Sequence, residues 1–411
     1  MKLPGAALLI LFGISAVRAS AEAADWHSRW YATAYAYPGI TELCKDSLLN
    51  PDNQIARLPE QSQRAELRFD FKAEHDKLHL SLRPILRWQK NSNAFSDETR
   101  HEAYLSQGRL RWSLAEAWNL SAGREVMTWG AGQFRSPSNP FYFDNGRSDP
   151  LRELSGLDAM KLSWTPDTRH SLSVGYIVSS GHDDGAIDNW QDTWILRATQ
   201  RESNWAGGIA LAKKAGQQVF VGIDGQYTLN DAVLLYVEVG SSTHLAALQS
   251  PVDAAQPFYI DTESARHTNA LIGASYTFEN GQSLGLEYLH QGHGFTAAEE
   301  AAYFNRAASA TLPSGANTLS MALAYAPPLL GRDYLYLLWQ NNILESDGYW
   351  RLMWARSLTD HGSQFSGYAE WTLGRRLSAF VLGIKPLGDA RQEFSSLISS
   401  MAMAGIKVAL P

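Results

Sequence analysis

In the first third of the sequence, basic side chains recur at even spacings, which in an extended chain place them on the same face. Arg64, Arg68 and Lys72 alternate with Glu66 and Asp70, so in an extended chain all five side chains lie on one face. A guanidinium group presents a planar fork of donors that suits carboxylates, phosphates and sulfates. This spacing therefore predicts a basic track for anionic or very polar solutes. Its expected members are Arg64, Arg68, Lys72, Arg83, Arg87 and Arg124.

The same charges also suit a second arrangement. Glu66, Asp70, Glu102 and Glu125 lie in or near these segments, and each could pair with an arginine. Such a lattice of ion pairs would brace a wall of strands whatever the protein carries. The sequence leaves both interpretations open.

Residue patterns for enzymatic chemistry are sparse. The sequence has no H-E-x-x-H motif, and its single cysteine, Cys44, can form neither an intramolecular disulfide nor a cysteine metal site. His290 and His293 are three residues apart, so on a strand they point to opposite faces and do not share a ligand. We therefore expect no enzyme, no metal and no cofactor.

Alternation of apolar and polar residues extends over most of the chain. Charged and apolar residues alternate from Arg64 to Ala73, where the row of five charges suits water and not a packed core. One apolar face and one polar face are typical of a strand with lipid on one side and water on the other. Further stretches with this period are 78–89, 219–228, 233–239, 270–278 and 319–325.

The links between these stretches differ in length in a regular way. Short turns are predicted at 74–76, 165–167, 202–204, 229–231 and 279–281. Long excursions are predicted at 38–62, 130–156, 244–266 and 294–315. Barrels of the bacterial outer membrane have short turns on the periplasmic side and long loops outside.

The first residues have the pattern of a secretory signal peptide. Lys2 precedes the apolar stretch 6–12, which runs into small residues. That stretch is shorter than the roughly 18 residues of a spanning helix. We expect cleavage after Ala21 or Ala23, with a signal peptide over 1–23 and the mature protein over 24–411.

These patterns together predict an all-β fold, a transmembrane antiparallel β-barrel of about 16–18 strands in the bacterial outer membrane. The composition agrees, because 14 Trp, 17 Tyr and 15 Phe can supply the aromatic girdles of such a barrel. The alternation slips near Gly108 and again near Gly123, as it does at a β-bulge.

The segment from Glu102 to Gly130 contains E-x-Y-L, a stretch that suits a hairpin, and then L-x-x-G-R-x-x-x-x-W-G. The matching residues are Glu102, Tyr104, Leu105, Leu120, Gly123, Arg124, Trp129 and Gly130, followed by Asn139-Pro140 and Asp144. The segment resembles a pattern of porin-like outer-membrane families, which include the alginate-export-type barrels. The resemblance implies a barrel whose loop at 130–156 folds inward.

That loop has the residues of a pore constriction. Phe134, Phe141, Tyr142 and Phe143 could anchor it against a wall. Opposed charges in a pore set its selectivity. The charged residues that we expect to project into water are Arg135, Asp144, Arg147, Asp149, Arg152 and Glu153. A loop folded over the barrel mouth is the alternative.

The net charge of −7 argues against nucleic acid as a partner. We expect a porin-like channel, surrounded by outer-membrane lipid, for passage or export of a polar, anionic solute or polysaccharide. A non-conducting scaffold that holds an envelope or secretion partner protein is the second hypothesis. A lipid-modifying enzyme is a distant third.

Overall fold

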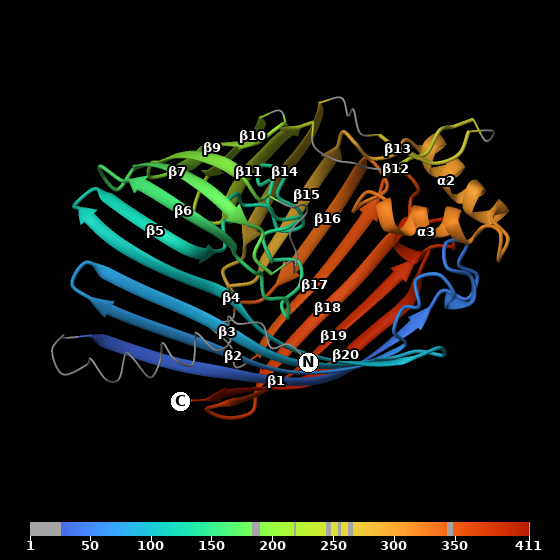
Figure 1. Cartoon of the computed structure of the whole chain (residues 1–411), viewed down its shortest axis with the longest axis horizontal. Coiled ribbons are helices and arrows are strands. Elements are labelled where there is room, and N and C mark those ends of the chain that lie inside the picture. Colours follow the sequence, from blue (N-terminus) through green and yellow to red (C-terminus); the bar gives the residue numbers. More distant parts are fainter. Residues whose placement is uncertain are drawn as a thin grey trace.

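The computed structural model describes residues 26–182, 190–217, 219–243, 248–253, 256–261, 266–342 and 348–410. Within this part of the chain, eighteen antiparallel strands form one sheet, and β1 pairs with β20 so that the sheet closes into a barrel (Figure 1). The predicted fold class and strand number are confirmed. The predicted signal peptide lies outside the described residues.

The strands of the barrel are β1 (His27–Leu43), β2 (Gln61–His75), β3 (Leu78–Ser92), β4 (Asp97–Ala115), β5 (Trp118–Glu125), β6 (Leu157–Trp164), β7 (His170–Ser179), β8 (Thr193–Arg201), β9 (Trp205–Lys214), β10 (Phe220–Thr228), β11 (Val233–Ser242), β14 (His267–Thr277), β15 (Ser283–Gln291), β16 (Asp333–Gln340), β17 (Gly348–Ser357), β18 (Ser363–Thr372), β19 (Leu377–Leu387) and β20 (Ile398–Leu410). Each strand is antiparallel to both of its neighbours.

The outward face of the barrel is apolar. On β6, Met160 and Leu162 are exposed, and they pair with Ala122 and Leu120 on the same face of β5. Large apolar side chains exposed in this way contact lipid in a membrane barrel, whereas the alternate residues face the interior. The described helices include none with the length and apolar character needed to cross a membrane.

Exposed aromatic side chains gather at the strand ends that meet the short turns. They are Trp112, Trp118, Trp164, Trp205, Tyr227, Tyr276, Trp339 and Trp371. Indole and phenol rings prefer the boundary between lipid and water because one end of the ring is apolar and the other can form hydrogen bonds. The row of rings therefore marks the periplasmic boundary of the membrane.

The loops are sorted by length as predicted. Two residues join β2 to β3 and β4 to β5, whereas the opposite ends of the strands carry the segments 44–60, 126–156 and 292–332. All three differ from their predicted bounds, which were 38–62, 130–156 and 294–315. β1 continues to Leu43, because its pairing with β20 and β2 extends past Pro38.

The predicted slip near Gly108 is a bulge at Ser106. Arg83 pairs with Gln107 and Pro84 pairs with Leu105, so Ser106 is the extra residue on β4. Its hydroxyl donates a hydrogen bond to the carbonyl oxygen of Arg83 at 3.0 Å. Proline has no N–H to contribute to a ladder, so its place beside the bulge is expected.

The slip predicted near Gly123 is wrong, because the register of β5 with β4 and β6 is unbroken there and shifts against β4 only between Ser113 and Ala115. Gly123 adopts a φ of 122°, which favours glycine, and a Cβ there would meet the carbonyl oxygen of Gly108 at 2.1 Å. β5 and β6 are only 8 residues long beside the 19-residue β4, and the segment 126–156 joins them. The wall is therefore shortest where this segment leaves and rejoins it.

A helical cap covers part of the loop end (Figure 1). It contains α2 (Ala297–Ser309), α3 (Ala316–Tyr325) and the small hairpin of β12 (Leu248–Gln249) and β13 (Tyr259–Ile260), packed in one apolar cluster with Leu49 of segment 44–60. The 3-10 helices η1 (Pro51–Asn53) and η2 (Glu393–Ser395) lie in neighbouring loops.

The strand predicted at 319–325 is wrong, because these residues belong to α3. Leu319 and Ala322, three residues apart, are the buried pair of this helix. A short apolar stretch fits both a period of two and a period of 3.6, so its pattern alone does not separate strand from helix.

Candidate functional site

The basic wall, as we name the interior face of β2, β3 and β4, is built around Glu66. Its carboxylate accepts hydrogen bonds from Arg68 at 2.7 and 2.9 Å and from Arg87 at 2.8 Å. Arg64 lies 3.6 Å from the same carboxylate and donates to Gln89 at 2.9 Å. The arginines are therefore held in fixed positions by an acid beneath them.

Arg83 forms the next connection along the wall. Its Nε donates to Asp70 at 2.8 Å, and its Nη1 donates to Glu153 of segment 126–156 at 2.7 Å. Arg87 also reaches Glu102, at 3.3 Å, and the hydroxyl of Tyr104, at 2.7 Å. The lattice of ion pairs considered from the sequence is thus present, and it includes one loop residue.

Arg124 does not join this wall, in contrast to the prediction. In the sheet, Arg124 pairs with Gly108 of β4 and with Asp158 of β6. It lies on the outward face, which also carries Trp118, Leu120 and Met160. Its guanidinium donates to both carboxylate oxygens of Asp158, at 2.7 and 2.8 Å. Alternation along β5 places Arg124 on the same outward face as Leu120 and Ala122, so the sequence already contained this signal.

The segment 126–156, which we name the crossing loop, lies within the ring of strands (Figure 1). Its first attachment is to Glu238 of β11. That buried carboxylate accepts hydrogen bonds from the backbone N–H of Gly132 at 2.7 Å and from the hydroxyls of Ser136 at 2.7 Å and Ser138 at 2.6 Å. One interior acid therefore holds three residues of the loop, Gly132, Ser136 and Ser138.

A second interior acid, Glu287 of β15, holds the neighbouring residues. It accepts from the backbone N–H of Gln133 at 2.6 Å and of Phe134 at 3.0 Å, and the Tyr236 hydroxyl orients it at 2.7 Å. The ring of Phe134 stacks on Tyr336 of β16 with centroids 4.5 Å apart. Polar and apolar contacts thus attach the same turn of the loop to β11, β15 and β16.

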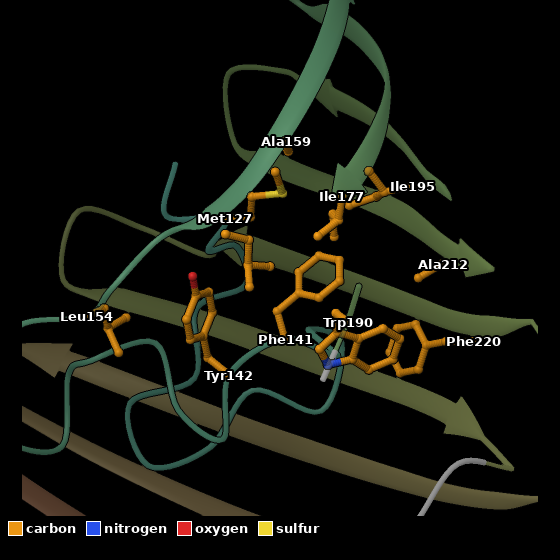
Figure 2. Packing of buried hydrophobic residues seen from close by; sticks show 11 residues of the cluster. Met127, Phe141, Tyr142, Leu154, Ala159, Ile177, Trp190, Ile195, Ala212 and Phe220 are labelled. Atoms are coloured by element: carbon orange, nitrogen blue, oxygen red, sulfur yellow. The ribbon is translucent and has the colours of Figure 1, made fainter. Parts of the chain in front are cut away.

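Apolar residues attach the start and the end of the crossing loop to a different part of the barrel. Figure 2 shows Phe141 and Tyr142 packed with Met127 and Leu154 of the same loop. The wall side of this cluster consists of Leu157, Ala159, Ile177, Ile195, Ala212 and Phe220, from β6 to β10, together with Trp190. Phe141 meets Trp190 edge-on at 5.3 Å.

Asp144 does not project into water, which corrects the prediction, whereas Arg135 is half-buried and lines a cavity on the loop side of the barrel. The guanidinium of Arg135 lies over the rings of Phe134 and Phe143, at 4.2 and 3.5 Å. Burial lowers the pKa of Arg135 to about 10. Asp144 is buried, and its carboxylate accepts hydrogen bonds from the N–H of Gly146, at 2.6 Å, and from Ser148 and Arg152.

The other four charged residues have different positions. Arg147 donates to the carbonyl oxygen of Gly132 at 3.0 Å and so braces the loop internally. Asp149, Arg152 and Glu153 line a cavity of about 990 Å³ on the loop side of the barrel. Arg135 lines the same cavity, so four of the six predicted constriction residues border it, and Asp144 and Arg147 have structural contacts instead.

The far end of the crossing loop returns to the basic wall. Arg68 donates to the carbonyl oxygen of Leu151 at 2.7 Å, and Glu153 meets Arg83. Because the loop also contacts β11 and β15, it spans the interior between two walls.

Two cavities follow the basic wall. The loop-side cavity, of about 990 Å³, is lined by Arg64 and Arg87, by Tyr37, which accepts a hydrogen bond from Arg64 at 3.2 Å, and by Tyr368 and several apolar residues. The turn-side cavity has a volume of about 320 Å³. Its lining includes Arg29, Lys72, Arg83, Arg109 and Arg111, with the acids Asp70 and Glu74. The Arg83–Glu153 pair lies where the two cavities meet, since Arg83 lines one and Glu153 the other.

Glu238 and Glu287 were not anticipated as anchors of the loop. Glu238 interrupts the apolar run of β11, which was a signal of a special role, but its partners are about 100 residues earlier in the chain. Contacts at that separation leave no periodic pattern in the sequence.

One motif of catalytic type, G-x-S-x-G, occurs at Gly281–Gly285. Ser283 begins β15 directly after the short turn from β14, so the serine is on a hairpin. A nucleophile elbow needs a sharp turn from a strand into a helix, with a histidine and an acid nearby. This hairpin supplies no such turn.

No protein-family model and no curated protein matches the chain. Among solved structures, OccK11 (OpdR) of Pseudomonas aeruginosa matches at a TM-score of 0.56 and 11% identity, over 93% of this chain and 96% of that one. OccAB1 of Acinetobacter baumannii matches at 0.53 and 11%, over 93% and 96%. OprD of Pseudomonas aeruginosa matches at 0.52 and 10%, over 93% and 95%. At this identity the likeness shows the fold, and the chain therefore has the fold of a porin-like β-barrel of the bacterial outer membrane.

Proposed function

We propose that the protein is a passive outer-membrane channel in which small anionic or very polar solutes move along the basic wall. The observation that supports this most directly is the position of the basic residues along the two cavities. Basic residues of β2 and β3 line the loop-side cavity and basic residues of β2, β3 and β4 line the turn-side cavity, with Arg83 beside Glu153 at their junction.

Three ion pairs of the interior favour anions because the cation is more exposed than the acid, whereas in the Arg87–Glu102 pair the acid is the more exposed, 33% against 10%. The side chain of Arg64 is 31% exposed while that of its partner Glu66 is 0% exposed. Arg83 is 30% exposed against 15% for Asp70, and Arg109 is 38% exposed against 16% for Glu125. The lattice therefore braces the wall and at the same time presents its cations to the lumen, so the two interpretations of the arginines are compatible.

The crossing loop favours small solutes over a polymer. It contacts β11 and β15 on one side and Arg68 and Arg83 on the other, so it divides the bore. A polysaccharide chain would need the loop to leave at least one of these walls. We therefore place polysaccharide export behind passage of a small solute.

Planar lipid bilayers test the proposal. We expect the purified barrel to conduct, and a potassium chloride gradient to give a reversal potential that indicates preference for chloride. Arg64→Gln and Arg87→Gln should each reduce that preference. Arg100→Gln is the matched control, because Arg100 is exposed at the far end of β4 and pairs only with Glu98 among the described residues.

Two results would reject the channel. The first is the absence of current both in the wild type and after deletion of residues 131–155. The second is a preference for potassium that neither arginine variant alters. A protein that co-purifies in the lumen and blocks all current would support the scaffold alternative.

A further inference from the structure

We infer that Arg356 and Lys385 form a site on the outer surface of the barrel for a phosphorylated glycolipid of the outer leaflet. They belong to β17 and β19, which flank β18 in the wall (Figure 1). Arg356 lies on the same face of β17 as Leu352, which is 50% exposed, and the alternate residue Ala355 is buried. Lys385 lies on the same face of β19 as Val381, which is 41% exposed. Both side chains therefore point away from the lumen.

An aromatic ring separates the two cations. In the sheet, Phe365 of β18 pairs with Lys385. Arg356 pairs with Ser363, two residues earlier on β18. The two cations are thus two strand spacings apart, about 10 Å across the sheet. The Phe365 side chain is 50% exposed between them. The long aliphatic stems of arginine and lysine can pass such a ring and carry both charges to one headgroup.

Both cations lie near the loop end of their strands. Arg356 is the last residue but one of β17, and Lys385 is two residues from the end of β19. At the opposite end of β18, Trp371 belongs to the row of rings that marks the periplasmic boundary. The loop end faces the cell exterior in outer-membrane barrels, so these two charges lie at the level of the lipid headgroups of the outer leaflet.

No carboxylate of the described residues neutralises these two cations. Arg124, on the outward face of β5, donates to both carboxylate oxygens of Asp158, at 2.7 and 2.8 Å. By contrast, the side chains of Arg356 and Lys385 have no hydrogen bond and no ion pair with any described residue. A charge beside hydrocarbon is stabilised when an anion accepts its hydrogen bonds. Phosphate oxygens suit both cations, because arginine binds phosphate through two parallel hydrogen bonds and lysine binds it as a point charge.

A hollow beside Lys385 has room for a headgroup. Its volume is about 850 Å³, and it lies at the loop ends of β1, β19 and β20. Its charged lining residues are Lys45, Lys385, Arg391, Glu42, Asp46 and Asp389. Because three cations face three acids, the hollow offers little net attraction to free phosphate. Carboxylates and cations together can hydrogen-bond the hydroxyl groups of a sugar, while the exposed apolar side chains toward the membrane centre contact acyl chains. The occupant is therefore an amphiphile with a phosphorylated sugar headgroup, as in lipid A.

Titration of the purified barrel in detergent micelles with diphosphorylated lipid A, followed by native mass spectrometry, tests the inference. We expect the wild type to bind lipid A. The apparent dissociation constant should be about fivefold higher in Arg356→Gln and in Lys385→Gln, the factor that the loss of one exposed ion pair gives. The double variant should bind more weakly than either single variant. Arg356→Lys and Lys385→Arg keep the charges and should bind almost as the wild type does.

Arg375→Gln is the matched control, because Arg375 is exposed in the short turn between β18 and β19, at the opposite end of the same strands. It should bind lipid A like the wild type. Wild-type affinity in the double variant, or an equal loss in Arg375→Gln, would overturn the site. Equal binding of phosphatidylglycerol, or displacement of lipid A by an equal concentration of inorganic phosphate, would overturn the glycolipid as its occupant. A shift in gel mobility on heating confirms that each variant is folded. Conductance plays no part in the measurement, so its outcome does not depend on the proposed channel.

Discussion

The carboxylate of Glu238 on β11 accepts a hydrogen bond from the hydroxyl of Ser138 at 2.6 Å, across 100 residues of sequence. The same carboxylate accepts from Gly132 and Ser136, so a single side chain of the barrel wall defines the path of the crossing loop at this point. The loop has few alternatives, because its backbone N–H groups are turned toward an interior acid and away from water.

Glu238→Ala should release this part of the loop. The substitution leaves the Gly132 N–H and two serine hydroxyls without their acceptor, at a cost of about 1–3 kcal/mol for each buried donor that finds no new partner. We expect a larger and noisier single-channel conductance than in the wild type. Glu279→Ala, in the turn after β14, is the control and should conduct like the wild type. Equal conductance in Glu238→Ala would show that the loop keeps its place without the acid.

Gly240→Ala tests the same contact from the backbone side. A Cβ at Gly240 would lie 1.8 Å from the carbonyl oxygen of Pro137, so the loop has to move away from β11. We expect the conductance to change in the direction seen for Glu238→Ala. Gly225→Ala on β10 is a matched control, since its nearest neighbour would be a Val237 side-chain atom at 3.9 Å. A wild-type conductance in Gly240→Ala would contradict this account of the loop path.

The barrel was predictable from the sequence because each strand carries its own signal. Alternation over eight or more residues shows which side chains meet lipid, and this holds for Arg64–Ala73 without knowledge of any partner strand. The separation of short turns from long loops shows which end of the barrel faces the periplasm. These signals are local, so one sequence is enough to supply them.

The interior was less predictable because its contacts are distant in sequence. Asp144 is of a residue type that usually faces solvent, yet a local turn encloses it, and Arg135 packs on two aromatic rings at the edge of the loop-side cavity. Charge alone cannot show whether a side chain of a long loop is enclosed by its own neighbours. α3 is a second case, because the seven residues at 319–325 fit both the period of two of a strand and the period of 3.6 of a helix.

A buried acidic cluster predicts a pH effect on the helical cap. Glu300 of α2 is buried near Asp360 and Glu393, and burial raises the pKa of Glu300 to about 9 and that of Glu393 to about 7. Tyr334 donates to Glu393, and Arg135 lies close enough to lower the pKa of Glu393 in part. Each carboxyl binds its proton more tightly in the folded cap than in the unfolded one.

The sign follows from this difference. The stabilising effect of the protonated form is complete below the ordinary pKa of about 4.5 and is lost as the pH rises through about 7 and about 9. We expect the amides of α2 to exchange hydrogen faster at pH 9 than at pH 5, after correction for intrinsic rates. Glu300→Gln should weaken that dependence. Equal protection at both pH values would contradict the effect.

The lipid-facing surface gives the last prediction. Ile272 of β14 is 61% exposed on the outward face, and Val252 is 59% exposed in the segment between β12 and β13. The two residues have similar exposure in different surroundings, lipid for the first and water for the second. Arginine at the bilayer midplane of a barrel costs about 2–4 kcal/mol, whereas arginine in water costs almost nothing. Ile272→Arg should therefore reduce the free energy of folding into lipid vesicles, measured by urea titration, by an amount in that range. Val252→Arg should leave it unchanged, and equal effects of the two substitutions would mean that β14 does not face the hydrocarbon.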